Sequence, residues 1–223
     1  MVREQYIRQL DVLKESVISF GKMVELIFCD SIDAFIDLDI KVAKRVLILA
    51  AKMDKYEEGI EVSISDLLAL QQPIASDLRL VISALKISAE LKRISELSIN
   101  IAKIPGKIEG EYVRSLMAIE KMSDIATYML ENSLKAFENQ DTELAKATAA
   151  RDDDVDKLFY IIWVELIEMM AKDTSIISKT TYLLFLIRYI EKIADHCCNI
   201  CESVVYLTTA ERVQLNGIYF ETI

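Results

Sequence analysis

Acidic side chains recur at four-residue spacing near the end of the chain, where they are suited to binding a cation. Glu191 and Asp195 are four residues apart, and residues at this spacing stack on one face of a helix about one turn apart. Two like charges at that spacing repel each other. If the pair lies among the apolar side chains of Ile190, Ile193 and Ile200, we expect a positive group between the two carboxylates.

A second group of carboxylates stands in the preceding predicted helix, where Asp152 and Asp156 are also four residues apart. Two such helices side by side supply four or more oxygen ligands, which suits a divalent or trivalent cation such as Mg, Mn, Zn or Fe. The alternative is that the acidic run is a solvated helix start and the single histidine an ordinary hydrogen-bonded residue. The candidate metal ligands are Glu191, Asp195, Asp153 and Asp156, with Asp152, His196 and Glu202 as additions and Asn199 available to orient the shell.

Signs of enzymatic chemistry are absent from the sequence. It has no glycine-rich phosphate loop and no nucleophile elbow, and its one histidine has no nucleophile near it in sequence. Three of the four cysteines, Cys197, Cys198 and Cys201, are close together on a predicted helix, without a second ligand pair at zinc-finger spacing. We therefore interpret them as small buried apolar residues and predict that the chain is not an enzyme.

The elements that position these residues are predicted to be helices. Gly and Pro number only 5 and 2 among 223 residues, and apolar residues recur at three- and four-residue spacing. The connection 104–110 holds one proline and two glycines, so it divides the chain into two three-helix halves, 1–104 and 111–210, followed by a tail, 211–223. The six predicted helices cover residues 6–35, 40–70, 73–103, 111–139, 142–172 and 175–209.

The two halves repeat one pattern. Segment 34–44 matches segment 136–146 at an offset of 102 residues, with Asp39 opposite Asp141. Further along, segments 54–57 and 91–101 match segments 153–156 and 190–200 at an offset of 99. Three residues are therefore missing from the middle helix of the second half. The repeat predicts two tandem, pseudo-symmetric three-helix bundles, each with antiparallel neighbouring helices around one core.

The charge of the chain excludes one class of partner and indicates a compartment. Lysine and arginine total 26 against 36 aspartate and glutamate, a formal net charge of −10, and no basic stripe is present to neutralise nucleic-acid phosphates. The charged, amphipathic N-terminus differs from a signal peptide, and the apolar runs are too short to span a bilayer. We predict a cytoplasmic protein that has no transmembrane segment and does not bind nucleic acid.

The chain resembles the PhoU family over nearly its whole length. The resemblance rests on Gln-Gln-Pro-Ile-Ala-Ser-Asp-Leu-Arg at 71–79, on Leu85-Lys86, and on the Glu-x-x-x-Asp of Glu191 and Asp195 with Asn199-Ile200 after it. The first string also suits a helix junction: Pro73 fits a first turn, Gln71 and Gln72 can bond the entering backbone, and Asp77 and Arg79 can tie the helix to a neighbour. A direct contact with a partner is the other interpretation of this string.

The resemblance implies a regulator that restrains phosphate-starvation signalling and phosphate import. It implies multinuclear metal clusters on the acidic motifs of two three-helix halves. It also implies two partners, the ATPase subunit of a phosphate ABC transporter and a membrane sensor histidine kinase. Peripheral membrane association through these partners and a homo-oligomeric state stay open. The competing hypothesis is a helical scaffold or chaperone-like module that binds partner helices through an apolar groove and has no metal site.

One position departs from the family pattern. Lys92 stands where an acidic residue is expected four positions before Glu96, and a protonated lysine cannot ligate a metal. Candidate carboxylate ligands remain in the first half at Asp54, Glu57, Glu90 and Glu96. We therefore expect the second half to carry the more intact metal site.

Overall fold

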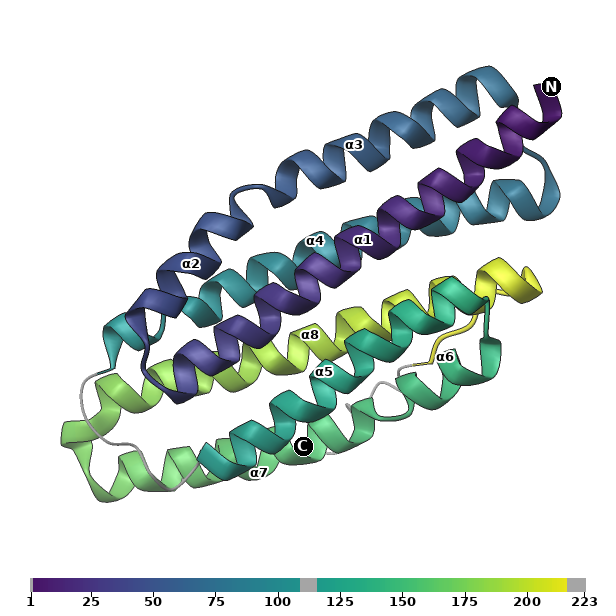
Figure 1. The fold of residues 1–223 in the computed structure, drawn as a ribbon. Helices are drawn as coiled ribbons and strands as arrows, with labels where there is room; N and C mark the ends of the chain where they lie inside the picture. The colour runs from purple at the N-terminus through teal and green to yellow at the C-terminus, as the bar shows by residue number, and fades with distance from the viewer. Residues whose placement is uncertain (1, 109–115, 216–223) are drawn as a thin grey trace.

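The computed structural model describes residues 2–108 and 116–215, and this part of the chain is all-α (Figure 1). The predicted helix start at Glu111, the connection residues Glu109 and Gly110, and residues 216–223 of the predicted tail lie outside the described residues. The α-helices are α1 (Val2–Ile36), α2 (Ile40–Ala50), α3 (Met53–Asp66), α4 (Ala75–Ala102), α5 (Leu116–Asn139), α6 (Thr142–Ala149), α7 (Asp152–Lys172) and α8 (Ile177–Thr209). A π-helical turn η1 (Leu67–Gln71) and two 3₁₀ turns, η2 (Pro105–Lys107) and η3 (Thr174–Ile176), complete the order.

The predicted pair of three-helix halves is confirmed, with one correction to each middle helix. The long middle helix is broken in both halves, into α2 and α3 and into α6 and α7. The breaks fall at the equivalent positions Ala51-Lys52 and Ala150-Arg151, where ψ lies between −11° and −15°. An α-helix has ψ near about −42°, so two residues at these values open the helix into a turn. The apolar periodicity continues across both breaks, which is why the sequence predicts one helix.

The missing residues of the second half lie in the short helix before the break. Helix α2 has 11 residues and helix α6 has 8, and each starts after its aspartate cap, Asp39 or Asp141. The difference of three residues changes the offset between the halves from 102 to 99. The repeat is therefore visible in the structure as well as in the sequence.

The entry into α4 differs in detail from the prediction. Gln71 ends η1, Gln72 has a left-handed backbone with φ 48°, and the helix begins at Ala75. Pro73 thus precedes the helix and does not lie in its first turn, because the left-handed residue reverses the chain before the proline. The expected ties to neighbours are present: Tyr6 Oη donates to Asp77 Oδ2 at 2.8 Å, and Arg79 Nε donates to the Leu207 carbonyl at 3.2 Å.

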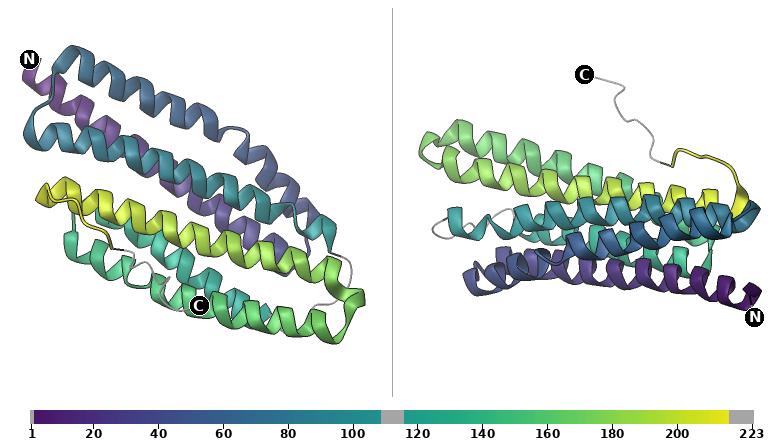
Figure 2. Two further views of the ribbon diagram at one scale, coloured as in Figure 1. Left: turned by 180° about the vertical axis from the view of Figure 1, so that it is seen from behind. Right: turned by 90° about the horizontal axis from the view of Figure 1, so that it is seen from above.

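One hydrophobic core runs through both halves. Helix α4 packs against α1 and α8, and α5 packs against α8 and α1, so the four long helices meet in the middle of the molecule (Figure 2). The broken helices α2–α3 and α6–α7 lie on opposite outer sides in Figure 1. Fully buried Phe20, Leu91, Phe137 and Ile193, from the four central helices, belong to the same core. None of the helices in the described ranges is long and apolar enough to cross a membrane.

Candidate functional site

The first-choice carboxylates of the second half face one another across α7 and α8. Glu191 and Asp195 lie one turn apart on α8, and Glu191 is only 8% exposed. Burial, followed by the nearby charge of Asp195, raises the pKa of Glu191. Burial, followed by the charges of Asp195 and Asp153, also raises the pKa of Asp156 on α7. Glu191, Asp195 and Asp156 are therefore close enough to repel one another, and Asp153 adds to the repulsion on Asp156.

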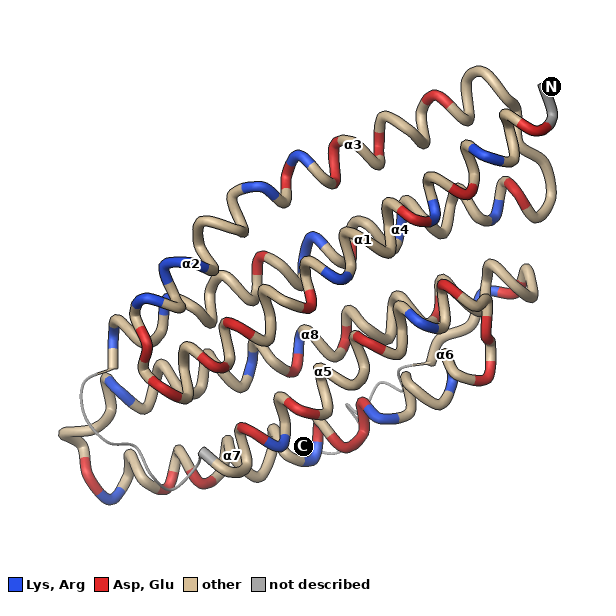
Figure 3. Tube along the Cα trace, viewed as in Figure 1, with Lys and Arg blue, Asp and Glu red and all other residues tan. Residues whose placement is uncertain are grey.

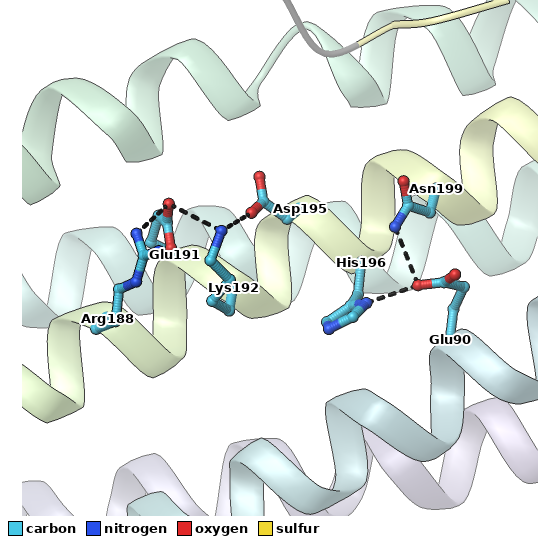
Figure 4. Close-up of polar contacts among 7 residues, drawn as sticks. All are labelled: Glu90, Arg188, Glu191, Lys192, Asp195, His196 and Asn199. Carbon is cyan, nitrogen blue, oxygen red and sulfur yellow. Dashed lines mark hydrogen bonds and ion pairs between the residues drawn. The ribbon is translucent and has the colours of Figure 1, made fainter. Parts of the chain in front are cut away.

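Two basic side chains of α8 neutralise this carboxylate group (Figure 4). Lys192 Nζ lies 2.5 Å from Asp195 Oδ2 and 3.5 Å from Glu191 Oε1, while Arg188 Nη1 lies 2.9 Å from Glu191 Oε1. The positive group expected between Glu191 and Asp195 is thus the ammonium of Lys192. The other Glu191 oxygen, Oε2, is buried and has no hydrogen-bond partner among the described residues.

The chemistry of this group fits a cation, although the carboxylates are not gathered around one point. Within residues 2–108 and 116–215, no three His, Cys, Asp or Glu side chains are close enough together to hold a metal ion. Hard cations nevertheless prefer carboxylate oxygens, which Asp153, Asp156, Glu191 and Asp195 all offer. Oε2 of Glu191 makes no hydrogen bond with the described residues and is available to a cation. A metal ion would have to displace Lys192 and Arg188, whose side chains are 37% and 50% exposed and so border on solvent.

Two of the three additional predicted ligands, Glu202 and His196, bind partners outside this group. Asp152 is buried at the start of α7, and its charge adds to the effect of burial in raising the pKa of the Cys198 thiol. Glu202 Oε1 accepts a hydrogen bond from the backbone N–H of Leu215 at 2.8 Å, which holds the segment after α8 against that helix. His196 points toward α4, away from Glu191 and Asp195 (Figure 4).

His196 and Glu90, predicted as ligands of different halves, bind each other across the boundary between the halves. His196 Nδ1 lies 2.6 Å from Glu90 Oε2, and Asn199 Nδ2 donates to the same oxygen at 3.1 Å. Burial opposes ionisation of Glu90, but the hydrogen bonds from His196 and Asn199 outweigh it and lower the pKa of that carboxyl. Both residues therefore join α4 to α8, and neither faces a carboxylate cluster of its own half.

The first-half carboxylates are arranged around two basic residues of α4. The Lys92 ammonium contacts the Asp54 carboxylate of α3, and Arg93 Nη1 lies 2.9 Å from Glu96 Oε2. Burial, followed by the charges of Glu61 and Glu96, raises the pKa of Glu57. Glu61 was not among the predicted ligands, although its position four residues after Glu57 places it on the same face of α3.

The other charged residues of the described chain are of mixed sign, and one further group of carboxylates lies near the end of α1, where burial, followed by the charges of Asp30 and Asp37, raises the pKa of Asp33. Acidic and basic residues are interspersed along the helices in Figure 3, without a continuous band of lysine and arginine among the described residues. Cys197, Cys198 and Cys201 are buried and free, as predicted. Burial raises the pKa of Cys201 to about 12, so this thiol is not a ready nucleophile or metal ligand.

Comparison with known proteins identifies the two halves. A family model described as the PhoU domain matches residues 17–104 and again residues 119–204, which lie in the first and second halves respectively. The chain belongs to the PhoU family. Each half is thus one PhoU domain, and the family expected from the motif at 71–79 is confirmed.

Named relatives cover nearly the whole chain. A phosphate-specific transport system accessory protein PhoU homolog of Clostridium acetobutylicum is 32% identical, over 97% of this chain and 100% of the relative. The corresponding PhoU accessory protein of Serratia marcescens is 31% identical, over 96% and 88%. The crystal structure of PhoU from Pseudomonas aeruginosa has a TM-score of 0.89 at 30% identity and covers 92% of this chain and 100% of that one. The first two relatives are named as accessory proteins, and a further solved structure, from Streptococcus pneumoniae with a TM-score of 0.88, is named as a phosphate transport system regulatory protein. Membership of this accessory and regulatory family confirms the prediction that the chain is not an enzyme.

The second PhoU domain has an exposed apolar stripe, although the apolar run of α7 predicts a buried helix face. Tyr160, Val164 and Ile167 occupy one face of α7 and are 69%, 37% and 43% exposed, with Trp163 beside them at 40%. The equivalent positions in the first domain, 99 residues earlier, include Glu61 and Ser65. The buried face of α7 is a different one, formed around Ile162 and Leu166. Trp163 also contacts Phe159, with the ring centroids 5.7 Å apart.

Proposed function

We propose that this PhoU-family chain regulates a phosphate transport system as a cytoplasmic, non-enzymatic adaptor between the transporter ATPase subunit and its sensor kinase. The observation that supports the proposal is the match over 97% of the chain to a relative named as an accessory protein of phosphate-specific transport. The fold supports it further, since the chain has two PhoU domains in tandem and matches the whole of the Pseudomonas aeruginosa PhoU structure with a TM-score of 0.89.

We further propose that the second PhoU domain binds a divalent or trivalent metal ion. Asp153 and Asp156 of α7 would hold the ion together with Glu191 and Asp195 of α8, and Lys192 would move into solvent. The bound ion supplies positive charge that removes the repulsion among these carboxylates and links α7 to α8. The buried Oε2 of Glu191, which has no hydrogen-bond partner among the described residues, supports the proposal because a cation would satisfy it. Burial, followed by the charges of neighbouring carboxylates, raises the pKa of both Glu191 and Asp156, which is consistent with the same need for positive charge.

Metal content tests the site. The variant Glu191→Gln with Asp195→Asn keeps the side-chain shapes and should lose most metal, measured by mass spectrometry on protein purified without chelator. A matched control, Glu165→Gln with Glu168→Gln, changes the same net charge farther along α7 and should keep its metal. Unchanged metal stoichiometry in the first variant would show that the assignment is wrong.

Phosphate uptake in the native cell tests the regulatory role. Deletion of the gene should raise uptake of labelled phosphate by cells grown in phosphate-rich medium, and the chain with an affinity tag should retain the transporter ATPase subunit. Uptake that stays at the repressed level after deletion would contradict the proposal.

The exposed stripe of α7 favours a second candidate, a scaffold or chaperone-like module that binds apolar segments. Tyr160, Val164 and Ile167 present the i, i+4, i+7 spacing that fits a partner helix. A chaperone-like module should suppress the aggregation of reduced, unfolded lysozyme without metal, and Tyr160→Ser with Ile167→Ser should weaken that effect. Aggregation that proceeds equally with and without the chain would exclude this function.

A further inference from the structure

The two PhoU domains place four residues at equivalent positions on the outer helix, α3 or α7, and on the last helix, α4 or α8. Three of the four positions carry a carboxylate in both domains: Asp54 and Asp153, Glu57 and Asp156, and Glu96 and Asp195. The fourth position carries Lys92 in the first domain and Glu191 in the second. The two domains therefore differ at one of the four positions, where the first domain has a basic side chain and the second has an acidic one.

Lys92 and Glu191 lie in similar surroundings. Their side chains are 17% and 11% exposed, and both stand on the last helix of their domain near the outer helix. The ammonium of Lys92 reaches the Asp54 carboxylate on α3. In the second domain, Glu191 is instead repelled by the carboxylates of Asp195 and Asp156. The first domain thus holds a positive charge at the position where the second domain holds a ligand.

We infer that Lys92 is a built-in counter-ion that replaces a metal ion in the first PhoU domain, so that metal binding is confined to the second domain. The inference rests on the metal binding proposed above. A protonated lysine has three donors and no acceptor, so it satisfies carboxylates but cannot ligate a cation. With Lys92 at this position, the first domain lacks one of the four carboxylates that the second domain has at the equivalent positions.

The basic residues of the second domain differ from Lys92 in position. Lys192 is equivalent to Arg93, one residue farther along the helix, and its side chain is 37% exposed. Turning Lys192 and Arg188 into solvent leaves carboxylates at all four equivalent positions of the second domain, whereas turning Lys92 away leaves carboxylates at only three of them in the first. An incoming ion therefore gains a complete set of donors only in the second domain.

A pair of equivalent substitutions tests the inference in the otherwise unchanged chain. Asp153→Asn should weaken Mn²⁺ binding by about tenfold or more, measured by calorimetry, because it removes a ligand. Asp54→Asn makes the same chemical change at the equivalent position and should leave the Mn²⁺ affinity within about twofold and the stoichiometry unchanged. A wild-type chain that binds an additional ion which Asp54→Asn removes would overturn the inference and leave the proposed second-domain site intact.

Substitution of the lysine itself supplies the converse test. Lys92→Glu restores the fourth carboxylate and should add one Mn²⁺ per chain, while the control Lys92→Gln, which removes the charge without adding a carboxylate, should not. Unchanged metal content in a folded Lys92→Glu variant, with the second-domain site still loaded, would count against the inference. Metal binding in neither wild type nor variant would instead refute the proposed metal site.

A double-mutant cycle, measured on metal-free protein, tests the counter-ion role separately. In the presence of EDTA, Lys92→Gln and Asp54→Asn should each change Tm. The Tm shift of the double variant should differ from the sum of the two single shifts by about 1–3 °C. This coupling is small because Asp54 is largely exposed, and exposed ion pairs contribute little to stability. Additive shifts would show that the pair has no energetic coupling and would overturn the counter-ion role whatever the metal data show.

Discussion

At the residue scale, Glu90 links the two PhoU domains. Its carboxylate lies on α4 and accepts hydrogen bonds from His196 and Asn199 of α8, more than 100 positions later in the chain. Arg93 is the other charged group that lowers the pKa of Glu90. A half-buried carboxylate is tolerated there because its donors satisfy it, and this makes the pair sensitive to loss of either partner.

Replacement of Glu90 by glutamine should lower stability at neutral pH and have little effect in acid. The folded-state pKa lies below the ordinary value of 4.5, so the stabilisation is fully present above pH 4.5 and is lost as the pH falls through the lower folded pKa. We expect Glu90→Gln to cost about 1–2 kcal/mol at pH 6, with the difference from wild type shrinking toward pH 3. Urea unfolding between pH 3 and 6 measures it.

The exposed Glu138 provides the control for this prediction. Glu138→Gln on α5 should change the free energy of unfolding by less than about 0.5 kcal/mol throughout that range. A destabilisation of Glu90→Gln that is the same at pH 3 and pH 6 would show that the hydrogen bonds do not depend on the charge of Glu90.

At the scale of elements, the short helices before the two breaks depend on their caps. Asp141 Oδ1 accepts from the Leu144 N–H at 2.9 Å, and Asp39 Oδ1 accepts from the N–H of Lys41 at 2.7 Å. Helix α6 has only 8 residues, so its free N–H groups are a large share of its backbone. The aspartate therefore determines where α6 starts.

Removal of this cap should destabilise the protein measurably. Asp141→Ala should lower the free energy of unfolding by about 1 kcal/mol, because the helix loses the acceptor for its first turn. Asp141→Asn retains an acceptor oxygen and should lower the free energy of unfolding by less than Asp141→Ala does. Denaturation monitored by circular dichroism distinguishes the two, and equal losses would show that charge rather than capping matters.

The contact between α1 and α5 depends on the smallness of Gly21. A methyl group at this position would overlap the side chain of Leu134, which is buried on α5. Gly21→Ala should therefore destabilise the protein by about 1–2 kcal/mol, because overpacking exceeds the gain of about 0.5–1 kcal/mol in helix propensity. In a Leu134→Ala background the same substitution should become neutral or stabilising. A destabilisation by Gly21→Ala that persists in that background would place its cause elsewhere.

At the scale of the molecule, the two PhoU domains share one core and should unfold together. Helices α1 and α5 pack against each other, as do α4 and α8, so separation of the domains would expose apolar residues such as Ile87 and Val204. We expect a single unfolding transition. The only tryptophan, Trp163, reports on the second domain, whereas circular dichroism reports on all helices. The two denaturation curves should coincide, and a separate transition in either probe would show that the domains are independent.

The sequence by itself determined the features that depend on short-range interactions. Helices follow from apolar residues at three- and four-residue spacing, and their starts follow from caps such as Asp39 and Asp141, because these interactions connect residues within one or two turns. The repeat offset of 99 also pairs Lys92 with Glu191, since both residues occupy the same position of a duplicated helix. The two domains and the acidic pairs on single helices were predictable for this reason.

Only the tertiary structure decided which helix faces meet. Helix α4 packs against α1, α3 and α8, so its periodicity does not reveal that Glu90 faces His196 on another domain. Glu191 and Asp195 were recognised as a pair, but the identity of their counter-ion depended on the rotamers of Arg188 and Lys192. Rotation of a helix about its axis and the choice among rotamers are set by packing against distant segments, and a single helix's sequence contains neither.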